Sequence, residues 1–213
     1  MLKNSYKALY VILFLIGQIV SLLFTHKLLH ILMEFFNIFY SGWTKRGFKK
    51  CKGRVRIEYP LELIGGKYIE IGKNFSSRGR LRMEVFDAFL TQKFTPALII
   101  GDNVCFNYDC HVGCVNKIIV GNNVLIGSRV LITDHFHGEI NHQALSMPPN
   151  LRPLISKGAV IIQDNVWIGE GAIIMPNVEI GTNSIIGANA VITKNVPANS
   201  VIGGVPGKII KSI

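Results

Sequence analysis

Two histidines lie close together in the segment TDHFHG, which covers residues 133–138 of a chain of 213 residues. A neutral imidazole accepts a proton near pH 7, so either ring could act as a general base toward an attacking hydroxyl group. Asp134, directly before His135, could order this loop or orient one of the rings. A single loop histidine is more often a solvated or structural ring, so the fold around His135 and His137 must decide between these interpretations.

The four cysteines offer a second kind of reactive group, at Cys51, Cys105, Cys110 and Cys114. Their spacing includes no C-x-x-C pair, which is typical of zinc ribbons and redox motifs. We therefore expect reduced thiols and no disulfide bond.

A period of six residues runs through the C-terminal half of the chain. Isoleucine recurs at every sixth position, in Ile162, Ile168, Ile174, Ile180, Ile186 and Ile192. The same period appears upstream in Ile100, Phe106 and Val112, slips by two residues, and resumes in Val120, Ile126 and Ile132. A strand and a turn repeated every six residues close a three-sided coil, and successive coils stack as parallel strands. The repeat predicts an all-β parallel β-helix from about residue 60 to about residue 205.

The first 58 residues differ in composition from the remainder, so we expect two regions, 1–58 and 59–213. Residues 8–24 (ALYVILFLIGQIVSLLF) are almost wholly apolar, and a second apolar stretch rich in aromatic residues follows at 28–43. Ten Lys and Arg against two acidic residues give this region a surplus of eight of the net charge of +10. The sequence predicts an N-terminal apolar helical segment that spans a membrane or lies on it.

The basic cluster from Lys45 to Arg56 predicts the side of the membrane on which the second region lies. Positive residues flanking an apolar segment favour the cytoplasmic side, where the membrane surface is anionic. No small-x-small cleavage site follows the first apolar run, so we expect no cleaved signal peptide. Residues after 60 are nearly neutral, which argues against nucleic-acid binding. We expect a cytoplasmic protein at the inner face of the cell membrane; alternatively, the two helices only cap the β-helix.

Two segments of the repeat resemble a known family. Residues 166–211, VWIGEGAIIMPNVEIGTNSIIGANAVITKNVPANSVIGGVPGKIIK, resemble the C-terminal signature of the hexapeptide-repeat acetyltransferases, which include the maltose, galactoside and nodulation-factor acetyltransferases. Residues 100–138, with VLITDHFHG, resemble most closely the lipopolysaccharide O-antigen O-acetyltransferases of that group. The resemblance implies a left-handed β-helix, a homotrimer, and an acetyl-CoA site in the cleft between subunits. It also implies acetyl transfer to a sugar hydroxyl by a histidine base without a covalent intermediate.

The resemblance assigns roles to individual residues. Alignment without gaps places the family's catalytic histidine at His137, and His135 is the second candidate. The same alignment places at Asn107 a family asparagine that contacts the acceptor or the cofactor near the thioester; alternatively, Asn107 is only a turn residue. The family's acidic residue at the acceptor site falls on Cys114 or Val115, so the acceptor geometry departs from the family pattern.

A further set of residues matches the family positions along the pantetheine and nucleotide of acetyl-CoA. These residues are Trp167, Glu170, Ala188, Thr193, Lys194, Lys208 and Lys211. The small Ala188 leaves backbone groups accessible to a long, thin ligand, and the lysines suit the phosphates of CoA. Each lysine alone is equally well explained as a solvated surface charge.

The stretch between Thr133 and Ile162 lacks the repeat and contains Pro148, Pro149 and Pro153. A loop of this length in a compact solenoid usually has a function. We expect it to fold over the cleft that binds the acceptor.

Other functions remain to be tested against this one. A zinc enzyme similar to the γ-type carbonic anhydrases would draw three ligands from His111, His135, His137 and His142. We expect no metal at these positions. A non-catalytic scaffold is another possibility. Among acetyltransferases, the N-terminal segment favours a glycan acceptor that is a surface-polysaccharide precursor, with a small soluble sugar or a longer acyl donor as alternatives.

Overall fold

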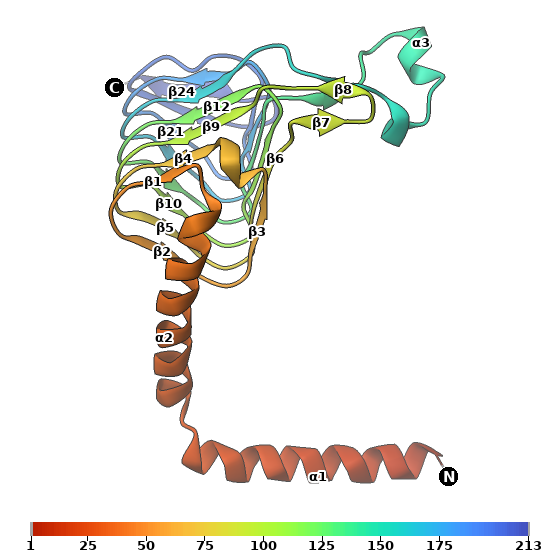
Figure 1. Ribbon diagram of the computed structural model, residues 1–213, viewed down its shortest axis with the longest axis vertical. Coiled ribbons are helices and arrows are strands. Elements are labelled where there is room, and N and C mark those ends of the chain that lie inside the picture. The colour runs from red at the N-terminus through yellow and green to blue at the C-terminus, as the bar shows by residue number, and fades with distance from the viewer. Residues whose placement is uncertain (1, 213) are drawn as a thin grey trace. The chain divides into compact units, whose positions relative to one another are not determined.

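The computed structural model describes residues 2–212, of which residues 2–5 and 23 are described by their backbone alone. The chain divides into two compact units, residues 1–39 and 40–213 (Figure 1). The first is helical, and the described strands all belong to the second. The expected functional boundary between residues 58 and 59 is a different division of the chain and stays a prediction.

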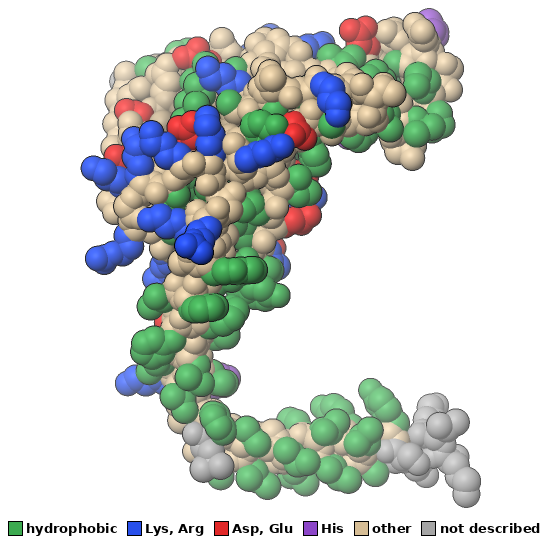
Figure 2. Space-filling view, in the orientation of Figure 1, with side chains coloured by type: hydrophobic (Ala, Val, Ile, Leu, Met, Phe, Trp, Pro, Cys, Tyr) green, Lys and Arg blue, Asp and Glu red, His purple; other side chains and the backbone are tan. Residues whose placement is uncertain are grey.

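The first unit consists of α1 (Leu2–Leu23) and the beginning of α2 (His26–Thr44). The large apolar side chains of α1 from Tyr6 to Leu22 are 45–80 % exposed, and they cover the helix surface in Figure 2. Within residues 2–212 no single helix has the length and apolar content of a membrane span. The bent pair Tyr6–Leu22 and His26–Gly47 meets both requirements together.

The second unit is wound into coils whose strands form three sheets (Figure 1). The first sheet contains β1 (Lys50–Cys51), β4 (Ile69–Ile71), β9 (Ala97–Ile100), β12 (Lys117–Val120), β17 (Val160–Ile162) and β20 (Glu179–Ile180). The second contains β2 (Val55–Ile57), β5 (Phe75–Ser77), β10 (Cys105–Phe106), β13 (Leu125–Ile126), β18 (Trp167–Ile168), β21 (Ile185–Ile186), β23 (Ser200–Gly203) and β24 (Lys208–Ser212). The third contains β3 (Leu61–Ile64), β6 (Leu81–Val85), β11 (His111–Cys114), β14 (Leu131–Thr133), β19 (Ile173–Ile174) and β22 (Val191–Ile192).

Strands that follow one another within a sheet belong to successive coils and pair in parallel, except that β24 runs antiparallel to β23. This arrangement confirms the predicted parallel sheets and the N-terminal helices. The sheets begin with β1 and β2, which lie before residue 60. Cys51, Ile57 and Leu63 keep the six-residue spacing there, but basic residues lie between the first two and make the repeat hard to see in the sequence.

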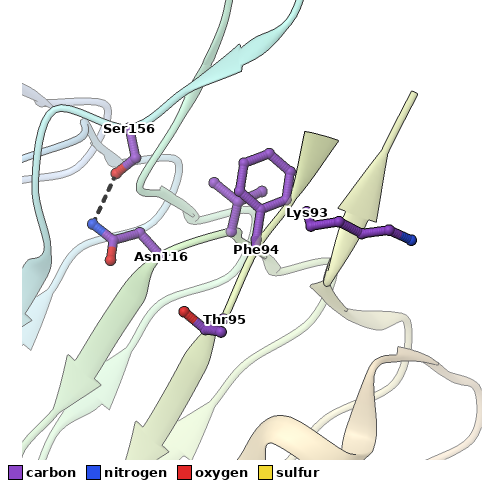
Figure 3. A pocket seen from close by; sticks show the side chains of 6 residues that line it. Lys93, Phe94, Thr95, Asn116 and Ser156 are labelled. Carbon is purple, nitrogen blue, oxygen red and sulfur yellow. Dashed lines mark hydrogen bonds between the residues drawn. The ribbon is translucent and has the colours of Figure 1, made fainter. Parts of the chain in front are cut away.

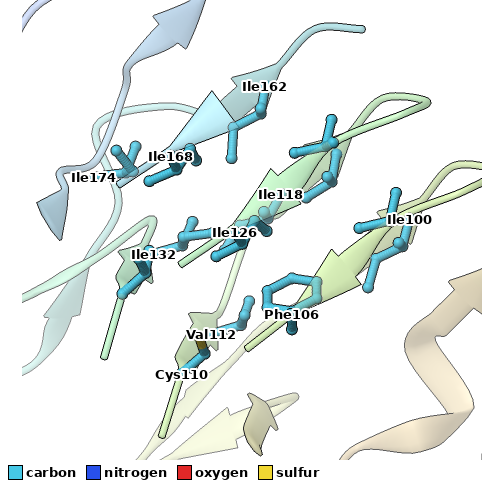
Figure 4. Close-up of a cluster of buried hydrophobic side chains, with 14 of the residues drawn as sticks. Ile100, Phe106, Cys110, Val112, Ile118, Ile126, Ile132, Ile162, Ile168 and Ile174 are labelled. Atoms are coloured by element: carbon cyan, nitrogen blue, oxygen red, sulfur yellow. The ribbon is translucent and has the colours of Figure 1, made fainter. Parts of the chain in front are cut away.

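The isoleucines of the six-residue period fill the interior of the coils (Figure 4). From Ile162 to Ile192 the six members are no more than 2 % exposed, and Ile100, Phe106 and Val112 upstream are equally buried. Full burial of one such side chain contributes about 1.5–3 kcal/mol. Because every coil adds side chains to the same core, the stack is held together along its length.

Asparagines form a ladder along one corner of the coils. Each has a positive φ, which asparagine tolerates better than most residues, and each side-chain amide except the last, Asn199, donates to the next amide at 2.9–3.1 Å. The ladder consists of Asn74, Asn103, Asn123, Asn165, Asn183 and Asn199. The Asn-bearing turns of the repeat therefore stabilise the corner through both backbone conformation and hydrogen bonds.

The last turn of α2 satisfies backbone groups at the open edge of the first coil. The Ser41 hydroxyl accepts from the Ile57 N–H at 2.8 Å and donates to the Ile57 carbonyl at 3.2 Å. The Tyr40 hydroxyl accepts from the Leu61 N–H at 3.1 Å and donates to its carbonyl at 3.4 Å. These two residues cap β2 and β3, which are edge strands.

Two short hairpins interrupt the coils. The first is β7 (Ala88–Phe89) with β8 (Gln92–Lys93), and the second is β15 (Phe136–His137) with β16 (Leu154–Ile155). The segment between β15 and β16 carries α3 (His142–Leu145) and a 3₁₀ turn (Pro149–Leu151); further 3₁₀ turns lie at Lys45–Gly47 and Gly66–Tyr68. Both hairpins project from the sheets on the same side (Figure 1).

Candidate active site

His137 lies in the second hairpin, at the start of the long loop that the sequence identifies. Its backbone pairs with Leu154, and its side chain is exposed. The ring lies 5.6 Å from the Phe89 ring in an edge-to-face arrangement, and 6.5 Å from the ring of His135. It lines a cavity of about 540 Å³ between the loop and β16. His137 is therefore the loop histidine that an incoming molecule can reach.

His135 is held by a buried carboxylate. Its Nδ1 lies 3.0 Å from Asp134 Oδ1 and 3.3 Å from the Thr133 hydroxyl, and its side chain is only 12 % exposed. A carboxylate that contacts one ring nitrogen fixes the orientation of an imidazole. The structure therefore brings Asp134 and His135 together and leaves His137 more open than His135.

Asp134 is fully buried and links the loop to the preceding coil. Its two carboxylate oxygens accept from the backbone N–H groups of Val115 at 3.0 Å and of Asn116 at 2.8 Å. Burial alone would raise the pKa of Asp134. Hydrogen bonds from His135, from these two N–H groups and from the Cys114 thiol outweigh burial and hold the pKa below its ordinary value. The register slip in the repeat falls here, because Val115 and Asn116 are the extra residues between β11 and β12.

A cavity of about 430 Å³ lies next to Val115 and Asn116 (Figure 3). It is lined by Lys93, Phe94, Thr95, Val115, Asn116 and Ser156, and the Asn116 amide donates to the Ser156 hydroxyl at 3.2 Å. This bond ties the loop to the start of β12.

A second imidazole–carboxylate pair lies on the outer face of the third sheet. His111 Nε2 is 2.8 Å from Glu84 Oε2, and Arg82 donates to the other oxygen of the same carboxylate at 2.7 Å. Burial alone would raise the pKa of Glu84. The hydrogen bonds and charges of Arg82 and His111 lower it by more, so the pKa lies below its ordinary value. A Cβ at Gly113 would lie 3.3 Å from His135 and 3.7 Å from His111, so both rings border this glycine.

The first hairpin supports the second through a contact that the sequence does not predict. Gln92 Nε2 donates to the Leu154 carbonyl at 3.0 Å, and Gln92 Oε1 accepts from the Leu154 N–H at 2.7 Å. Phe89, on the paired strand β7, contacts the ring of His137. Neither residue was among the predicted site residues, because their hairpin lies outside the six-residue period.

Asn107 follows β10 in the second sheet. Its side-chain amide donates to the Ile126 carbonyl of the next coil at 2.9 Å, and its own N–H donates to the same oxygen. Among the described residues no hydrogen bond joins Asn107 to either loop histidine. Both the turn role and the role near a thioester therefore stay predictions.

The predicted cofactor residues lie on the surface of the last coils. Trp167 is 51 % exposed on β18. Across the second sheet it pairs with Ile185, which pairs with Val201, and Val201 pairs with Lys211. Glu170, after β18, forms an ion pair with Arg129. The remaining members are all exposed: Ala188, Thr193, Lys194 and Lys208. Their role in binding acetyl-CoA stays a prediction.

The cysteines and the potential metal ligands are the other reactive groups of the chain. The four cysteines are free thiols; burial raises the pKa of Cys110 to about 11 and that of Cys114 further still. Because the thiolate is the nucleophile, neither thiol is reactive at neutral pH. Within residues 2–212 no three His, Cys, Asp or Glu side chains are arranged to hold a metal ion.

Comparison with known proteins agrees with this architecture. The family model "Bacterial transferase hexapeptide (six repeats)" matches residues 159–194. A protein of Escherichia coli K12 named as a lipopolysaccharide biosynthesis O-acetyl transferase, WbbJ, is 36 % identical over 159 residues, which cover 73 % of this chain and 77 % of WbbJ. The galactoside O-acetyltransferase of Lactococcus lactis is 32 % identical and is aligned over 73 % of this chain and 69 % of its own length.

Solved structures show the same relationship. A maltose O-acetyltransferase from Clostridium difficile 630 superposes with a TM-score of 0.55 and 31 % identity, over 79 % of this chain and 72 % of that one. A galactoside acetyltransferase in complex with coenzyme A gives a TM-score of 0.57 and 27 % identity, over 81 % and 68 % of the two chains. The resemblance seen in the sequence is confirmed: the chain belongs to the hexapeptide-repeat acetyltransferase family and is an acetyl-CoA-dependent acyltransferase.

Proposed function

We propose that this enzyme transfers an acetyl group from acetyl-CoA to a sugar hydroxyl of a surface-polysaccharide precursor, such as an O-antigen, capsule or exopolysaccharide. The observation that carries the proposal is the position of His137, which lines an open cavity in a chain of this family. The name of WbbJ supports lipopolysaccharide as the polymer. The similarity to galactoside acetyltransferases favours a second candidate, a small soluble sugar.

The proposed base is His137, with His135 as the alternative. As the acceptor oxygen attacks the thioester carbon, its proton passes to the imidazole, the C–S bond breaks, and the departing sulfur takes the proton. No covalent intermediate is needed once both substrates are positioned. In this proposal Asp134 and His135 hold the loop, while Asn107 contributes near the thioester.

The acetyl-CoA site is proposed from family membership and from the exposed surface of the last coils. Trp167, Glu170, Ala188 and Thr193 would line the pantetheine, and the lysines would meet the phosphates: Lys194, Lys208 and Lys211. We further propose a left-handed winding of the coils and a homotrimer in which this surface lies in a cleft between neighbouring subunits.

We propose that residues 1–58 hold residues 59–213 at the cytoplasmic face of the cell membrane, where lipid-linked glycans are made. The exposed apolar surface of α1 supports contact with acyl chains, and the basic residues from Lys45 to Arg56 support contact with anionic headgroups.

Mass spectrometry of glycans from cells with and without the protein tests the acceptor. The proposal predicts that a surface-polysaccharide precursor loses one acetyl group when the protein is absent. An acetyl difference confined to free sugars would favour the second candidate. If no glycan changes and acetyl-CoA is not cleaved with any glycan, the acceptor is not a glycan and the proposal is wrong.

A further inference from the structure

The cavity beside His137 is lined by two cations that lack a carboxylate partner. Arg152 and Lys157 both face it, and among the described residues neither forms an ion pair. Glu139 also lines the cavity, and its carboxylate accepts from the amide of Asn141 at 3.0 Å. The lining therefore carries an excess of positive charge next to the proposed base.

Arg152 is fixed in place by the backbone that follows His137. Its Nε donates to the Met147 carbonyl at 3.0 Å, and its stem crosses Gly138, where a Cβ would lie 2.9 Å from Arg152 Cδ. Gly138 has a φ of +83°, and its N–H donates to the Pro153 carbonyl at 2.8 Å. Only glycine combines this conformation with room for the arginine stem. The guanidinium is thus positioned relative to His137, with its terminal NH₂ groups left for a ligand.

The remainder of the lining suits a sugar-sized molecule. Phe136 and Ile155, which pair across the hairpin, form an apolar wall, and Lys157 Nζ lies 6.0 Å from the Phe136 ring. A volume of about 540 Å³ falls within the usual range of small-molecule sites.

We infer that the acceptor carries an anionic group, a carboxylate or a phosphate, close to the hydroxyl that is acetylated, and that Arg152 and Lys157 bind it. This inference rests on the proposed function. A fixed arginine that lacks an acidic partner favours an anionic ligand, and a guanidinium can bind two oxygens of such a group at once. With a neutral sugar bound, the lining would hold two cations against the one carboxylate of Glu139.

The test uses the full chain and glycans from cells that lack it. These glycans are separated into neutral and anionic fractions and incubated with the protein and radiolabelled acetyl-CoA. We expect the label in the anionic fraction. Carbodiimide reduction of carboxylates, or mild-acid removal of glycosyl phosphates, then identifies the source of the charge by abolishing the reaction.

Two variants connect the charge preference to this cavity. Arg152→Gln and Lys157→Gln should each raise the KM for the anionic acceptor about tenfold, the effect of one charge-assisted hydrogen bond, and leave the KM for acetyl-CoA unchanged. Lys93→Gln, which alters an exposed lysine on β8 at the other cavity, is the matched control.

Equal labelling of both fractions, or an unchanged acceptor KM in both variants, would overturn the inference while leaving the proposed function intact. A rise in the KM for acetyl-CoA instead would assign these cations to the cofactor and also overturn it. Label in neither fraction would overturn the proposed function itself.

Discussion

The carboxamide of Gln92 brackets the backbone of Leu154, donating to its carbonyl at 3.0 Å and accepting from its N–H at 2.7 Å. Leu154 is the residue that pairs with His137 across the β15–β16 hairpin. The hairpin that carries the proposed base is therefore held by a side chain that precedes Leu154 by 62 positions in sequence.

Replacing Gln92 by Ala should lower kcat about tenfold, because the base is displaced from its acceptor while the cofactor surface is untouched. Gln92→Glu can still accept from the Leu154 N–H but cannot donate to the Leu154 carbonyl, so its kcat should lie between those of the wild type and Gln92→Ala. The measurement is steady-state kinetics with both substrates varied, and Lys93→Ala on the same hairpin is the control. An unchanged kcat in Gln92→Ala, or a loss confined to the KM for acetyl-CoA, would show that the clamp does not position the base.

Asp134 should make stability depend on acid pH. Its pKa is lowered in the folded chain, so its contribution is complete above the unfolded value of about 3.9 and is lost as the pH falls through the lower, folded value. In Asp134→Asn one amide N–H would face the donors of Val115 or Asn116, which should cost about 3 kcal/mol at pH 7. Urea unfolding from pH 7 downward should show a smaller acid loss in the variant than in the wild type. Parallel curves would contradict this role. The pKa of Asp109 is also lowered, by Arg80, but that ion pair is exposed, so Asp109→Asn should change the acid loss much less than Asp134→Asn does.

The repeat could be predicted from the sequence because each inward position has one requirement, a buried aliphatic side chain every sixth residue. Ile162, Ile168 and Ile174 meet it with almost no exposure. The first coil was harder to recognise, because its inward residues Cys51 and Ile57 lie in a basic segment and only Ile57 is a fully buried aliphatic side chain.

The site was only partly predictable. The loop histidines stand out by type and position, and Asp134 was expected to orient a ring or order the loop. The burial of Asp134, however, depends on N–H groups of the previous coil, and the contact of Gln92 with Leu154 spans two irregular insertions. Such non-local contacts have no periodic signal in the sequence, so only the folded chain reveals them.

The asparagine ladder should contribute measurably to stability. Asn123 accepts from Asn103 at 2.9 Å, donates to Asn165 at 3.0 Å, and has a φ of +56°. Asn123→Ala should cost about 3 kcal/mol, from two hydrogen bonds and a strained backbone, whereas Asn123→Gly avoids the strain and should cost less.

Asn177 provides the matched control for this ladder. It has a φ of +61° but makes no side-chain hydrogen bond among the described residues, so Asn177→Ala should cost only the backbone strain, about 1–2 kcal/mol. The denaturant midpoints of Asn123→Ala, Asn123→Gly and Asn177→Ala measure how much stability each variant loses. Equal losses in Asn123→Ala and Asn177→Ala would mean that the ladder bonds add nothing.

Removing residues 1–39 should release the chain from membranes without unfolding it. The exposed apolar surface of α1 is lost, while Tyr40 and Ser41 remain to cap β2 and β3. Removing residues 1–43 takes these caps away and should lower the melting temperature as well. Fractionation at low and high salt separates the apolar contribution from that of Lys45–Arg56. Unchanged sedimentation of the shorter deletion at high salt would contradict the anchor.

The most direct test of the proposed chemistry is the initial rate at which the full chain releases free CoA from acetyl-CoA in the presence of its glycan acceptor. His137→Ala should lower this rate at least a hundredfold, the usual contribution of a general base, and leave binding of CoA unchanged. His142→Ala, which removes another exposed histidine of the same loop, should retain the rate. A His137→Ala protein that cleaves acetyl-CoA at the wild-type rate would contradict the assignment of the base.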